Sequence, residues 1–452
     1  MRSLVLATAL VVAGAVPGIA QSAAVERSIR PEIRPAPVIV ASTASLTPRP
    51  SALAVRISLR PVVRPASLGG PEAAPPPAAS NIGFRRWVES FRRRALAQGI
   101  ERSVFDRAFR GVRYNADVIQ RDRNQSEFTK PIWDYLDSAV SPTRVRNGRA
   151  ALERYGEALD AIEARYGVEK EVVAAVWGLE SAYGEVTGKT PIIGALATLA
   201  HDGRRAAFFE EQLVAALRIL QAGDIAPDDM TGSWAGAMGH TQFMPTSYLD
   251  HAQDFTGDGR RDIWSSDPTD ALASTAAYLK HFGWTTGQPW GVEVRLPDGF
   301  DYALSGERVK KPVATWTRLG VRDMDGKPVP EHGPASILLP AGARGAAFMI
   351  FDNFHVLERY NPADAYVIGV GHLSDRLTGG PAIRAGWPRG DRPLRFSERR
   401  EMQRLLTRAG FDTRGIDGIV GPDTIAAVKA FQADSGMTPD GYASLDVLKR
   451  LR

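Results

Sequence analysis

The chain has 452 residues and a formal net charge of +5, from 56 basic and 51 acidic side chains. The basic excess lies in the first 80 residues, which hold eight Arg, three Glu and no Phe, Tyr or Trp. The chain therefore lacks the combined basic and aromatic surface that is typical of nucleic-acid binding, and its length predicts two or three domains. The absence of cysteine excludes disulfides, thiolate catalysis and cysteine-rich zinc sites.

Residues 1–24 have the layout of a secretory signal peptide. A basic start precedes an apolar run over 4–16, and small residues follow it. An N-terminal membrane anchor is the alternative, but the run is shorter than the roughly 20 residues that a spanning helix needs. We expect cleavage near Ala20 or Ala24 and a soluble protein exported to the periplasm, with no cysteine to carry a lipid anchor.

Residues 25–80 form a segment rich in Pro, Ala, Ser, Val and Arg, and residues 1–80 hold 12 of the 31 prolines. Such a segment cannot bury enough apolar surface to offset the loss of chain entropy. We therefore predict a disordered linker, with the folded domain beginning near residue 81.

Helical spacing of apolar residues dominates the next part of the chain. The pattern predicts long helices within 84–112 and 141–167, the second ending at a glycine. This half of the domain is therefore expected to be helical.

The stretch GVEKEVVAAVWGLESAYGEVTGK, residues 167–189, predicts a helix that carries a catalytic candidate. Val173, Val176 and Leu179 lie on its buried stripe, and Glu180 falls on the same stripe. A carboxylate there is costly to ionise, so its pKa should rise and keep it protonated near neutral pH, able to donate a proton. A Glu near a helix end can instead turn to solvent or pair with a basic side chain.

The stretch GSWAGAMGHTQFMPTSYLD, residues 232–250, combines small residues with hydrogen-bonding and aromatic side chains. Four of the six residues after Trp234 are Gly or Ala, which lets another chain approach the backbone closely. Gln242 and Tyr248 add hydrogen bonds and stacking surface. The combination suits a sugar, and it suits tight helix packing equally well.

The stretch DFTGDGRRD, residues 254–262, is similar to the first half of an EF-hand loop. Its oxygen ligands for calcium would be Asp254, Thr256, Asp258 and the carbonyl of Arg260. Position 12 is Ser265 instead of Glu, so a closing carboxylate must come from later in the chain. A turn rich in Asp and Gly that binds no ion is the alternative.

Strand spacing appears from residue 291 onward. VEVRLP, ASILLP and AAFMIFDNF predict strands of a small β-rich insertion, after which residues 354–373 return to helices. A second composition break at 379–396 predicts a linker, and 397–452 predicts a module of three short helices, the first capped by Ser397. The predicted fold class is α+β and mainly α.

Several of these stretches together resemble the membrane-bound lytic murein transglycosylase B family, in order and at consistent spacing over about 82–375. The matching motifs are ESAYG from Glu180, GKTPIIGALATLAHDGRRAAFF, GSWAGAMGHTQFMPTSY and DFTGDGRRDIW. The resemblance implies a goose-lysozyme-like helical core within 81–378 that cleaves peptidoglycan between N-acetylmuramic acid and N-acetylglucosamine. The tail, 397–452, is similar to a small peptidoglycan-binding module through GIDGIVGPDTIAAVKAFQ.

The resemblance also implies roles for single residues. Glu180 would be the only catalytic acid and base. The residues that it places around the substrate are Ser233, Gln242, Tyr278, Tyr360, Asn361 and, in a poorer motif, Tyr135. Core packing is the alternative for each aromatic residue. Asp270 would close the calcium loop despite two extra residues, with Asp267 as a competitor, and the calcium would be structural, so that the chemistry needs no cofactor.

A lone carboxylate fits a reaction that does not use water. Glycosidases that use water normally need two carboxyl groups, about 5–5.5 Å or 6.5–9.5 Å apart, and the sequence shows no obvious partner for Glu180. Glu180 would protonate the glycosidic oxygen, the substrate's acetamido oxygen would capture the oxocarbenium ion, and Glu180 would then activate the C6 hydroxyl. The product would be a 1,6-anhydro end, formed by an intramolecular attack.

Two other functions remain open from the sequence. A hydrolytic muramidase would release reducing ends instead of anhydro ends, and a catalytically silent wall-binding protein would have no activity on purified cell walls. Peptidoglycan strands are the expected partner in each case, with cell-wall synthesis or division proteins as further candidates.

Overall fold

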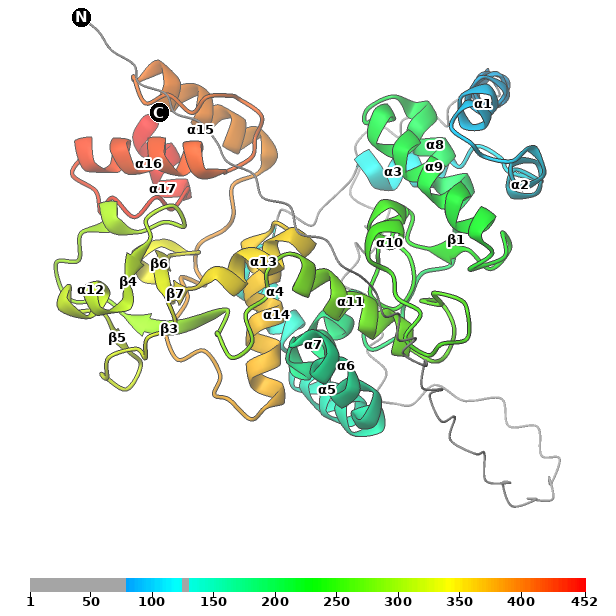
Figure 1. The fold of residues 1–452 in the computed structure, drawn as a ribbon. Coiled ribbons are helices and arrows are strands. Elements are labelled where there is room, and N and C mark those ends of the chain that lie inside the picture. Colours follow the sequence, from blue (N-terminus) through cyan, green and yellow to red (C-terminus); the bar gives the residue numbers. More distant parts are fainter. Residues whose placement is uncertain (1–78, 124–129) are drawn as a thin grey trace, which may run out of the picture. The chain divides into compact units, whose positions relative to one another are not determined.

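The computed structural model describes residues 79–123 and 130–452. The predicted signal peptide and nearly all of the predicted linker lie outside these residues. The described part of the chain is mainly helical, with a small five-stranded sheet (Figure 1), which confirms the predicted fold class. None of the helices in these two ranges is both long enough and apolar enough to cross a bilayer.

A first group of helices contains the N-terminal described residues. Its members are α1 (Ala79–Ala97), α2 (Arg102–Ala108), α3 (Ala116–Arg123), α8 (Ile192–Asp202) and α9 (Ala206–Ala222). Helix α8 packs along α9, and the other three contact this pair. Phe84, Phe91 and Ala95 are buried at helical spacing, as predicted. Gly99 then reverses the chain at a φ of 86°, so the predicted helical pattern over 84–112 is two helices.

A second group of helices surrounds α7, which follows Gly167. Its members are α4 (Ile132–Ala139), α5 (Pro142–Arg154), α6 (Gly156–Tyr166), α7 (Lys170–Ser181), α11 (Thr269–His281) and α14 (Asp364–Leu377). Helices α5, α6, α11 and α14 all contact α7. Every side chain from Val172 to Leu179 is buried, so the prediction of a single buried stripe was wrong. Small residues such as Ala174 and Gly178 let the neighbours cover all faces of this helix.

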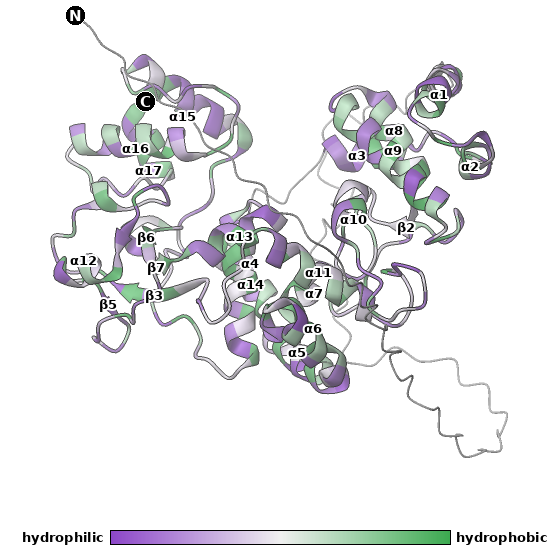
Figure 2. Ribbon diagram, viewed as in Figure 1, coloured by the Kyte–Doolittle hydropathy of each residue, from purple (hydrophilic) through white to green (hydrophobic). Residues whose placement is uncertain are grey.

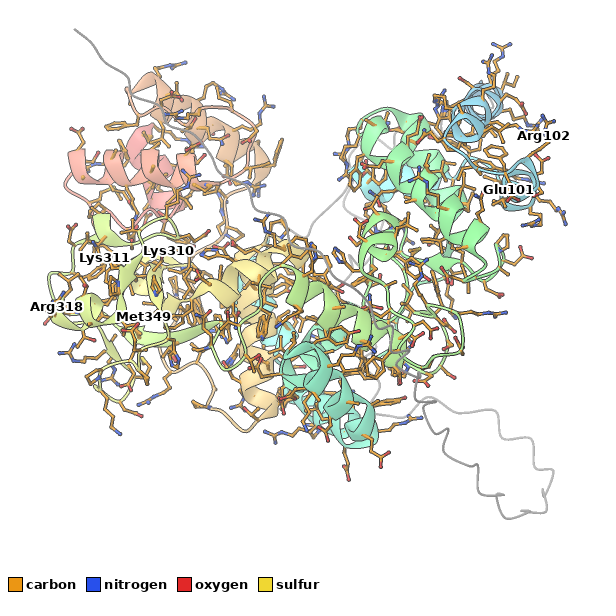
Figure 3. The ribbon with its side chains drawn as sticks, viewed as in Figure 1. Glu101, Arg102, Lys310, Lys311, Arg318 and Met349 are labelled. Atoms are coloured by element: carbon orange, nitrogen blue, oxygen red, sulfur yellow. The ribbon has the colours of Figure 1, made fainter. Side chains whose placement is uncertain are left out.

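The predicted β-rich insertion is present. Its antiparallel strands, in the order β4-β6-β7-β3-β5, are β3 (Gly291–Arg295), β4 (Lys311–Pro312), β5 (Arg322–Asp323), β6 (Pro334–Leu338) and β7 (Ala347–Ile350). Between them lie η1 (Tyr302–Leu304), α12 (Val313–Arg318) and η2 (Gly342–Arg344). Met349 lies inside the insertion's own core, whereas Arg318 is exposed (Figure 3). The predicted strand over 346–354 is shorter in the structure. Strand β7 ends at Ile350, because α13 (Asp352–Tyr360) begins two residues later.

The tail forms a separate core from three helices, as predicted: α15 (Phe396–Arg408), α16 (Pro422–Asp434) and α17 (Leu445–Leu451). Hydrophilic residues are frequent along α15 (Figure 2), while Met402 and Leu406 are fully buried. The prediction that Ser397 caps the first helix was wrong. The helix begins earlier, with Arg395 as N-cap, and Glu398 at the third position accepts a hydrogen bond from the Arg395 N–H.

The stretch before the module is bound to the preceding domain. Trp387 packs beside Trp133, with 6.4 Å between the ring centroids, and Arg389 forms an ion pair with Asp137. Its backbone at 384–385 donates to the Glu293 carboxylate. Residues 379–390 are therefore anchored to the domain, although we predicted a linker with few groups to bury.

Candidate active site

Glu180 lies in the last turn of α7, at the end of a buried helix, and its own side chain is half-buried. The chain reverses directly after it, with left-handed backbone at Ala182 (φ 53°) and Tyr183 (φ 61°). Such angles are unfavourable for residues with a Cβ and persist only where contacts enforce them. Ser181 supplies one such contact, because its hydroxyl donates to the His240 carbonyl at 2.5 Å and accepts from Gly184 N–H at 3.0 Å.

The Tyr366 side chain contacts Glu180 directly. Tyr366 is buried on α14, and its hydroxyl donates to Glu180 Oε1 at 2.7 Å. Burial, followed by the nearby Glu180 carboxylate, raises the pKa of Tyr366 well above its usual range, so this hydroxyl keeps its proton. Tyr366 lies in the stretch 354–373 that was predicted to be helical, but the residue was not selected from the sequence. The available signal was a tyrosine within an apolar helix, because a buried hydroxyl needs a partner.

Three of the predicted aromatic residues lie near Tyr366. The Tyr360 ring stacks parallel to that of Tyr366 at 6.5 Å, and Tyr278 meets Tyr360 edge-on at 5.1 Å. Tyr135, on α4, packs close to Gly369 of α14 and interacts electrostatically with Tyr366. Tyr360 and Tyr366 therefore both lie close to Glu180, and Tyr278 and Tyr135 interact with these two tyrosines.

The hydroxyls of two of these tyrosines donate hydrogen bonds to backbone carbonyls of the protein. Tyr360 donates to the Thr241 carbonyl at 2.6 Å, and Tyr278 donates to the Arg359 carbonyl at 2.5 Å. The rings therefore pack the loop and helix ends around Glu180. Asn361, just after Tyr360, is half-buried and accepts from Ala363 N–H through its side-chain oxygen.

Gln242 lies in the glycine-rich loop after β2 (Thr231–Gly232), which pairs with β1 (Thr190–Pro191) and leads to α10 (Pro245–His251). Its backbone is left-handed at φ 57°, and its side-chain N–H groups donate to the carbonyls of Thr187 and Gly239. Its buried Oε1 has no hydrogen-bond partner among the described residues. Rotating the amide would set this oxygen against two carbonyls, so the network fixes its orientation.

Ser233 is buried in the same loop, where it shapes a turn. Its hydroxyl accepts from Ala237 N–H at 2.9 Å, and its own N–H donates to the Ala237 carbonyl at 2.7 Å. Its visible role is to hold the shape of the loop that carries Gln242.

His240 connects this loop to α7, which the sequence analysis did not anticipate. Trp177 Nε1 donates to His240 Nδ1 at 3.2 Å, so the ring proton resides on Nε2, which donates to the Ser265 carbonyl at 2.7 Å. Burial lowers the pKa of His240, which favours this neutral form. His240 therefore joins the helix that carries Glu180 to the segment that follows the Asp-rich loop.

The Asp-rich loop brings three carboxylates together. One oxygen each of Asp254, Asp258 and Asp270 lies within 4.8 Å of the others. Asp270 is the later carboxylate that faces the loop, and it accepts from the N–H groups of Phe255 and Thr256. Asp267 instead accepts from Thr269 at the start of α11. This donor set fits an oxygen-loving cation such as calcium, with Thr256 and the Arg260 carbonyl as the other expected ligands.

Comparisons with known families match two parts of the chain. Residues 83–375 match the transglycosylase SLT domain, and residues 396–451 match a peptidoglycan binding domain. The chain is 35% identical over 250 residues to "Membrane-bound lytic murein transglycosylase B" of Escherichia coli (strain K12). This alignment covers 54% of the chain and 66% of the relative, just under two thirds of its length.

Solved structures extend the similarity over most of the chain. SltB3 from Pseudomonas aeruginosa, in complex with NAG-anhNAM-pentapeptide, is 49% identical at a TM-score of 0.80 and covers 82% of this chain and 99% of its own. A further SltB3 structure holds NAG-NAM-pentapeptide. The Escherichia coli lytic transglycosylase Slt35, in complex with calcium, is 30% identical at a TM-score of 0.56 and covers 66% of this chain and 94% of its own.

Proposed function

The chain belongs to the transglycosylase SLT domain family, and we propose that it is a lytic transglycosylase that cleaves the β-1,4 bond between N-acetylmuramic acid and N-acetylglucosamine in peptidoglycan. The observation that carries this proposal is the half-buried carboxyl group of Glu180, oriented by the Tyr366 hydroxyl at 2.7 Å. One relative, SltB3, supports the substrate class, because two of its structures contain peptidoglycan fragments.

Glu180 acts first as an acid. It lies in the last turn of α7, where the Tyr366 hydroxyl holds its carboxyl group in place for proton transfer. This proton passes to the glycosidic oxygen as its bond to C1 breaks. The acetamido oxygen of the same sugar then bonds to C1, and the hydrogen bond from Tyr366 strengthens as Glu180 becomes anionic.

Glu180 then acts as a base. Its carboxylate takes the proton of the C6 hydroxyl, O6 bonds to C1, and the acetamido oxygen leaves C1. The product is a 1,6-anhydro sugar, Glu180 is protonated again, and water is not consumed. The attack is intramolecular, which gives the C6 oxygen a high effective concentration at C1.

Gln242 binds the substrate through its unpaired oxygen. A buried acceptor without a donor costs roughly 1–3 kcal/mol, and Gln242 Oε1 is such an acceptor. A sugar N–H or hydroxyl would satisfy it, and the acetamido N–H is a donor of the right kind. Ser233, Asn361 and the tyrosines beside Glu180 line or shape the same site.

The Asp-rich loop holds a structural calcium ion. Asp254, Asp258 and Asp270 supply carboxylates, with the Thr256 hydroxyl and the Arg260 carbonyl completing the ligands. Calcium would neutralise three crowded charges and stabilise the loop. The related Slt35 was solved in complex with calcium, which supports this choice of ion.

The protein acts on the cell wall from the periplasm. Its tail matches a peptidoglycan binding domain, and we place wall attachment there, next to the catalytic domain that cuts the strands. Wall-synthesis or division proteins are candidate partners, because cutting must be coordinated with insertion of new strands.

Glu180→Gln tests the proposal. Gln keeps the size and can accept from Tyr366 but cannot transfer the proton, so release of anhydro-muropeptides should fall at least about a hundredfold, with the melting temperature unchanged. Glu185→Gln, at an exposed position five residues later, is the matched control and should keep full activity. Mass spectrometry of the released fragments separates the functions. Reducing ends would identify a muramidase, and no product from the native enzyme would identify a silent wall-binding protein.

A further inference from the structure

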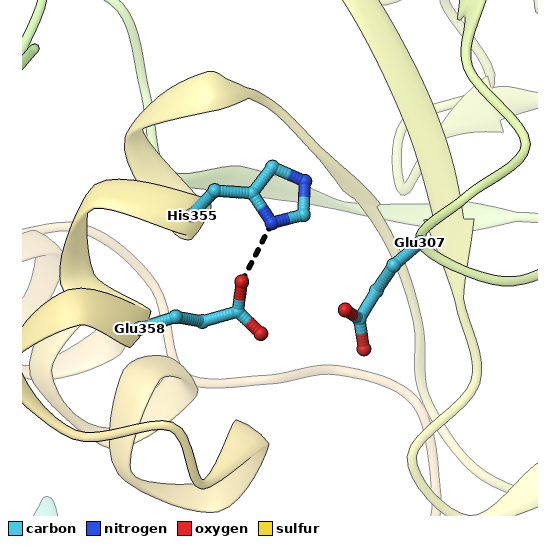
Figure 4. Close-up of side chains that lie close together, drawn as sticks. All are labelled: Glu307, His355 and Glu358. Carbon is cyan, nitrogen blue, oxygen red and sulfur yellow. Dashed lines mark hydrogen bonds and ion pairs between the residues drawn. The ribbon is translucent and has the colours of Figure 1, made fainter. Parts of the chain in front are cut away.

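One histidine and two glutamates converge between the β-rich insertion and α13, outside the site built around Glu180. His355 and Glu358 stand three residues apart on one face of α13, and Glu307 comes from the segment between η1 and β4 (Figure 4). One ligand atom from each lies within 4.8 Å of the other two. His355 Nδ1 and Glu358 Oε2 are 2.6 Å apart.

The backbone on both sides of this cluster is held in place. The Glu307 carbonyl accepts from the Ser336 hydroxyl at 2.9 Å, and Gly306 N–H donates to the Ile337 carbonyl at 2.7 Å. Strand β6 therefore fixes the segment that carries Glu307, while the other two side chains project from a regular helix. Ligand groups mounted on such supports lose little conformational freedom when they bind an ion.

The cluster has an excess of negative charge. Asp364 lies close enough to interact with Glu307 and Glu358. Three carboxyl groups therefore lie near a single imidazole, that of His355. In the described ranges, neither Lys nor Arg forms an ion pair with any of the three, and nearby Lys310 pairs with Asp352 instead. Half-buried carboxylates that crowd together in this way need a cation or a proton to balance their charge.

We propose that Glu307, His355 and Glu358 bind a divalent transition-metal ion, represented by Zn2+, with Asp364 as an additional ligand or outer partner. An imidazole nitrogen with carboxylate oxygens suits zinc, whereas calcium and magnesium prefer oxygen ligands alone. The site therefore differs in chemistry from the Asp-rich loop. A bound ion would tie the insertion to α13, which ends at Tyr360, and its role is structural.

Calorimetric titration of the full chain with Zn2+, with calcium present to saturate the Asp-rich loop, tests the site. We expect one Zn2+ per chain at this cluster, a rise in melting temperature, and at least a tenfold weaker affinity for both His355→Gln and Glu307→Gln. Cobalt substitution should give an absorption spectrum typical of nitrogen and oxygen ligands, which the His355 variant loses. The native chain failing to bind Zn2+ would overturn the proposal.

His281→Gln is the matched control. His281 and His251 lie with their ring centroids 4.8 Å apart, and such an imidazole pair could bind zinc outside the proposed site. Zinc affinity should be unchanged in this variant. Loss of zinc binding in His281→Gln, or unchanged zinc affinity in His355→Gln, would show that zinc binds elsewhere and would overturn the proposal. Should the His355 variant fail to fold, Glu307→Gln decides, since it removes a crowded charge and is expected to melt no lower than the native chain without zinc.

Discussion

The end of α7 and the C-terminal module are both built from helices and turns, but they are stabilised over very different distances along the chain. At the end of α7, Ser181 binds a residue 59 positions away and Glu180 binds one 186 positions away. In the module, Gln403 accepts from Gly418 N–H, 15 positions away, and Gln432 accepts from Gly441 N–H, 9 positions away.

The C-terminal module is therefore stabilised by residues close together in sequence, whereas the end of α7 is stabilised by residues far apart in sequence. Two buried glutamines each hold a glycine turn within the module, so this continuous 56-residue stretch shapes its turns through local hydrogen bonds and has its own core, while Lys429 and Asp440 also bind the insertion. The environment of Glu180 exists only after α14, the Gln242 loop and the Asp-rich loop have packed against α7. A change far from Glu180 in sequence should therefore impair catalysis, whereas the module should withstand separation.

His240→Leu should give the largest effect, because it removes the link between α7 and the loop segment. The change leaves Trp177 Nε1 and the Ser265 carbonyl without their partner, which should destabilise the protein by about 3 kcal/mol in urea unfolding. His240→Gln keeps a donor and an acceptor and should recover much of this loss. A Leu variant within about 0.5 kcal/mol of native would show that these long-range bonds contribute little.

Asp258→Ala tests whether the Asp-rich loop stabilises the catalytic part of the chain. Calcium at about a hundred times its dissociation constant stabilises the native state by about 2.7 kcal/mol. The native melting temperature should therefore rise with calcium and fall after prolonged chelation, and the variant should lose this response. Asp267→Asn is the control, because Asp267 accepts from Thr269 and should leave the response intact. If neither calcium nor chelator changes the melting temperature of the native chain, the loop does not bind calcium and the proposed site is contradicted.

Tyr366→Phe should have a moderate effect confined to activity. It removes the hydrogen bond to Glu180 Oε1 and keeps the buried ring, so turnover should fall about tenfold, equivalent to about 1.4 kcal/mol. Tyr278→Phe is the comparison variant, since its hydroxyl donates to a backbone carbonyl and not to Glu180. Equal losses in kcat for the two variants would argue against a direct role for Tyr366.

Deletion of residues 391–452 should have the smallest effect on the remaining domain. The cut follows the anchored 379–390 stretch and removes a few contacts to the insertion, chiefly those of Lys429 Nζ with Ser305 and Tyr302. Cleavage of short soluble glycans should stay within about twofold, while digestion of insoluble cell walls slows about tenfold, because the module raises the local concentration of polymer. Unfolding of the truncated chain, or an equal loss on soluble fragments, would refute an independent module.

The sequence predicted much of the candidate site but not its connections. Glu180 and Gln242 were selected from motifs, and the structure places the first beside Tyr360 and Tyr366 and leaves the second with a free acceptor. Their roles remain predictions until variants are measured. Tyr366 and His240 were not selected, because their significance depends on partners that only folding brings close.

Local patterns in the sequence determined the helices, the β-rich insertion, the three-helix module and the Asp-rich loop, because helix period, strand alternation and turn residues act over a few neighbouring positions. The tertiary structure alone decided that α7 is covered on all faces, that Tyr366 meets Glu180, and that Glu307 meets His355. Such contacts join residues dozens to hundreds of positions apart. Their geometry follows from the packing of whole helices and strands, which no local spacing records.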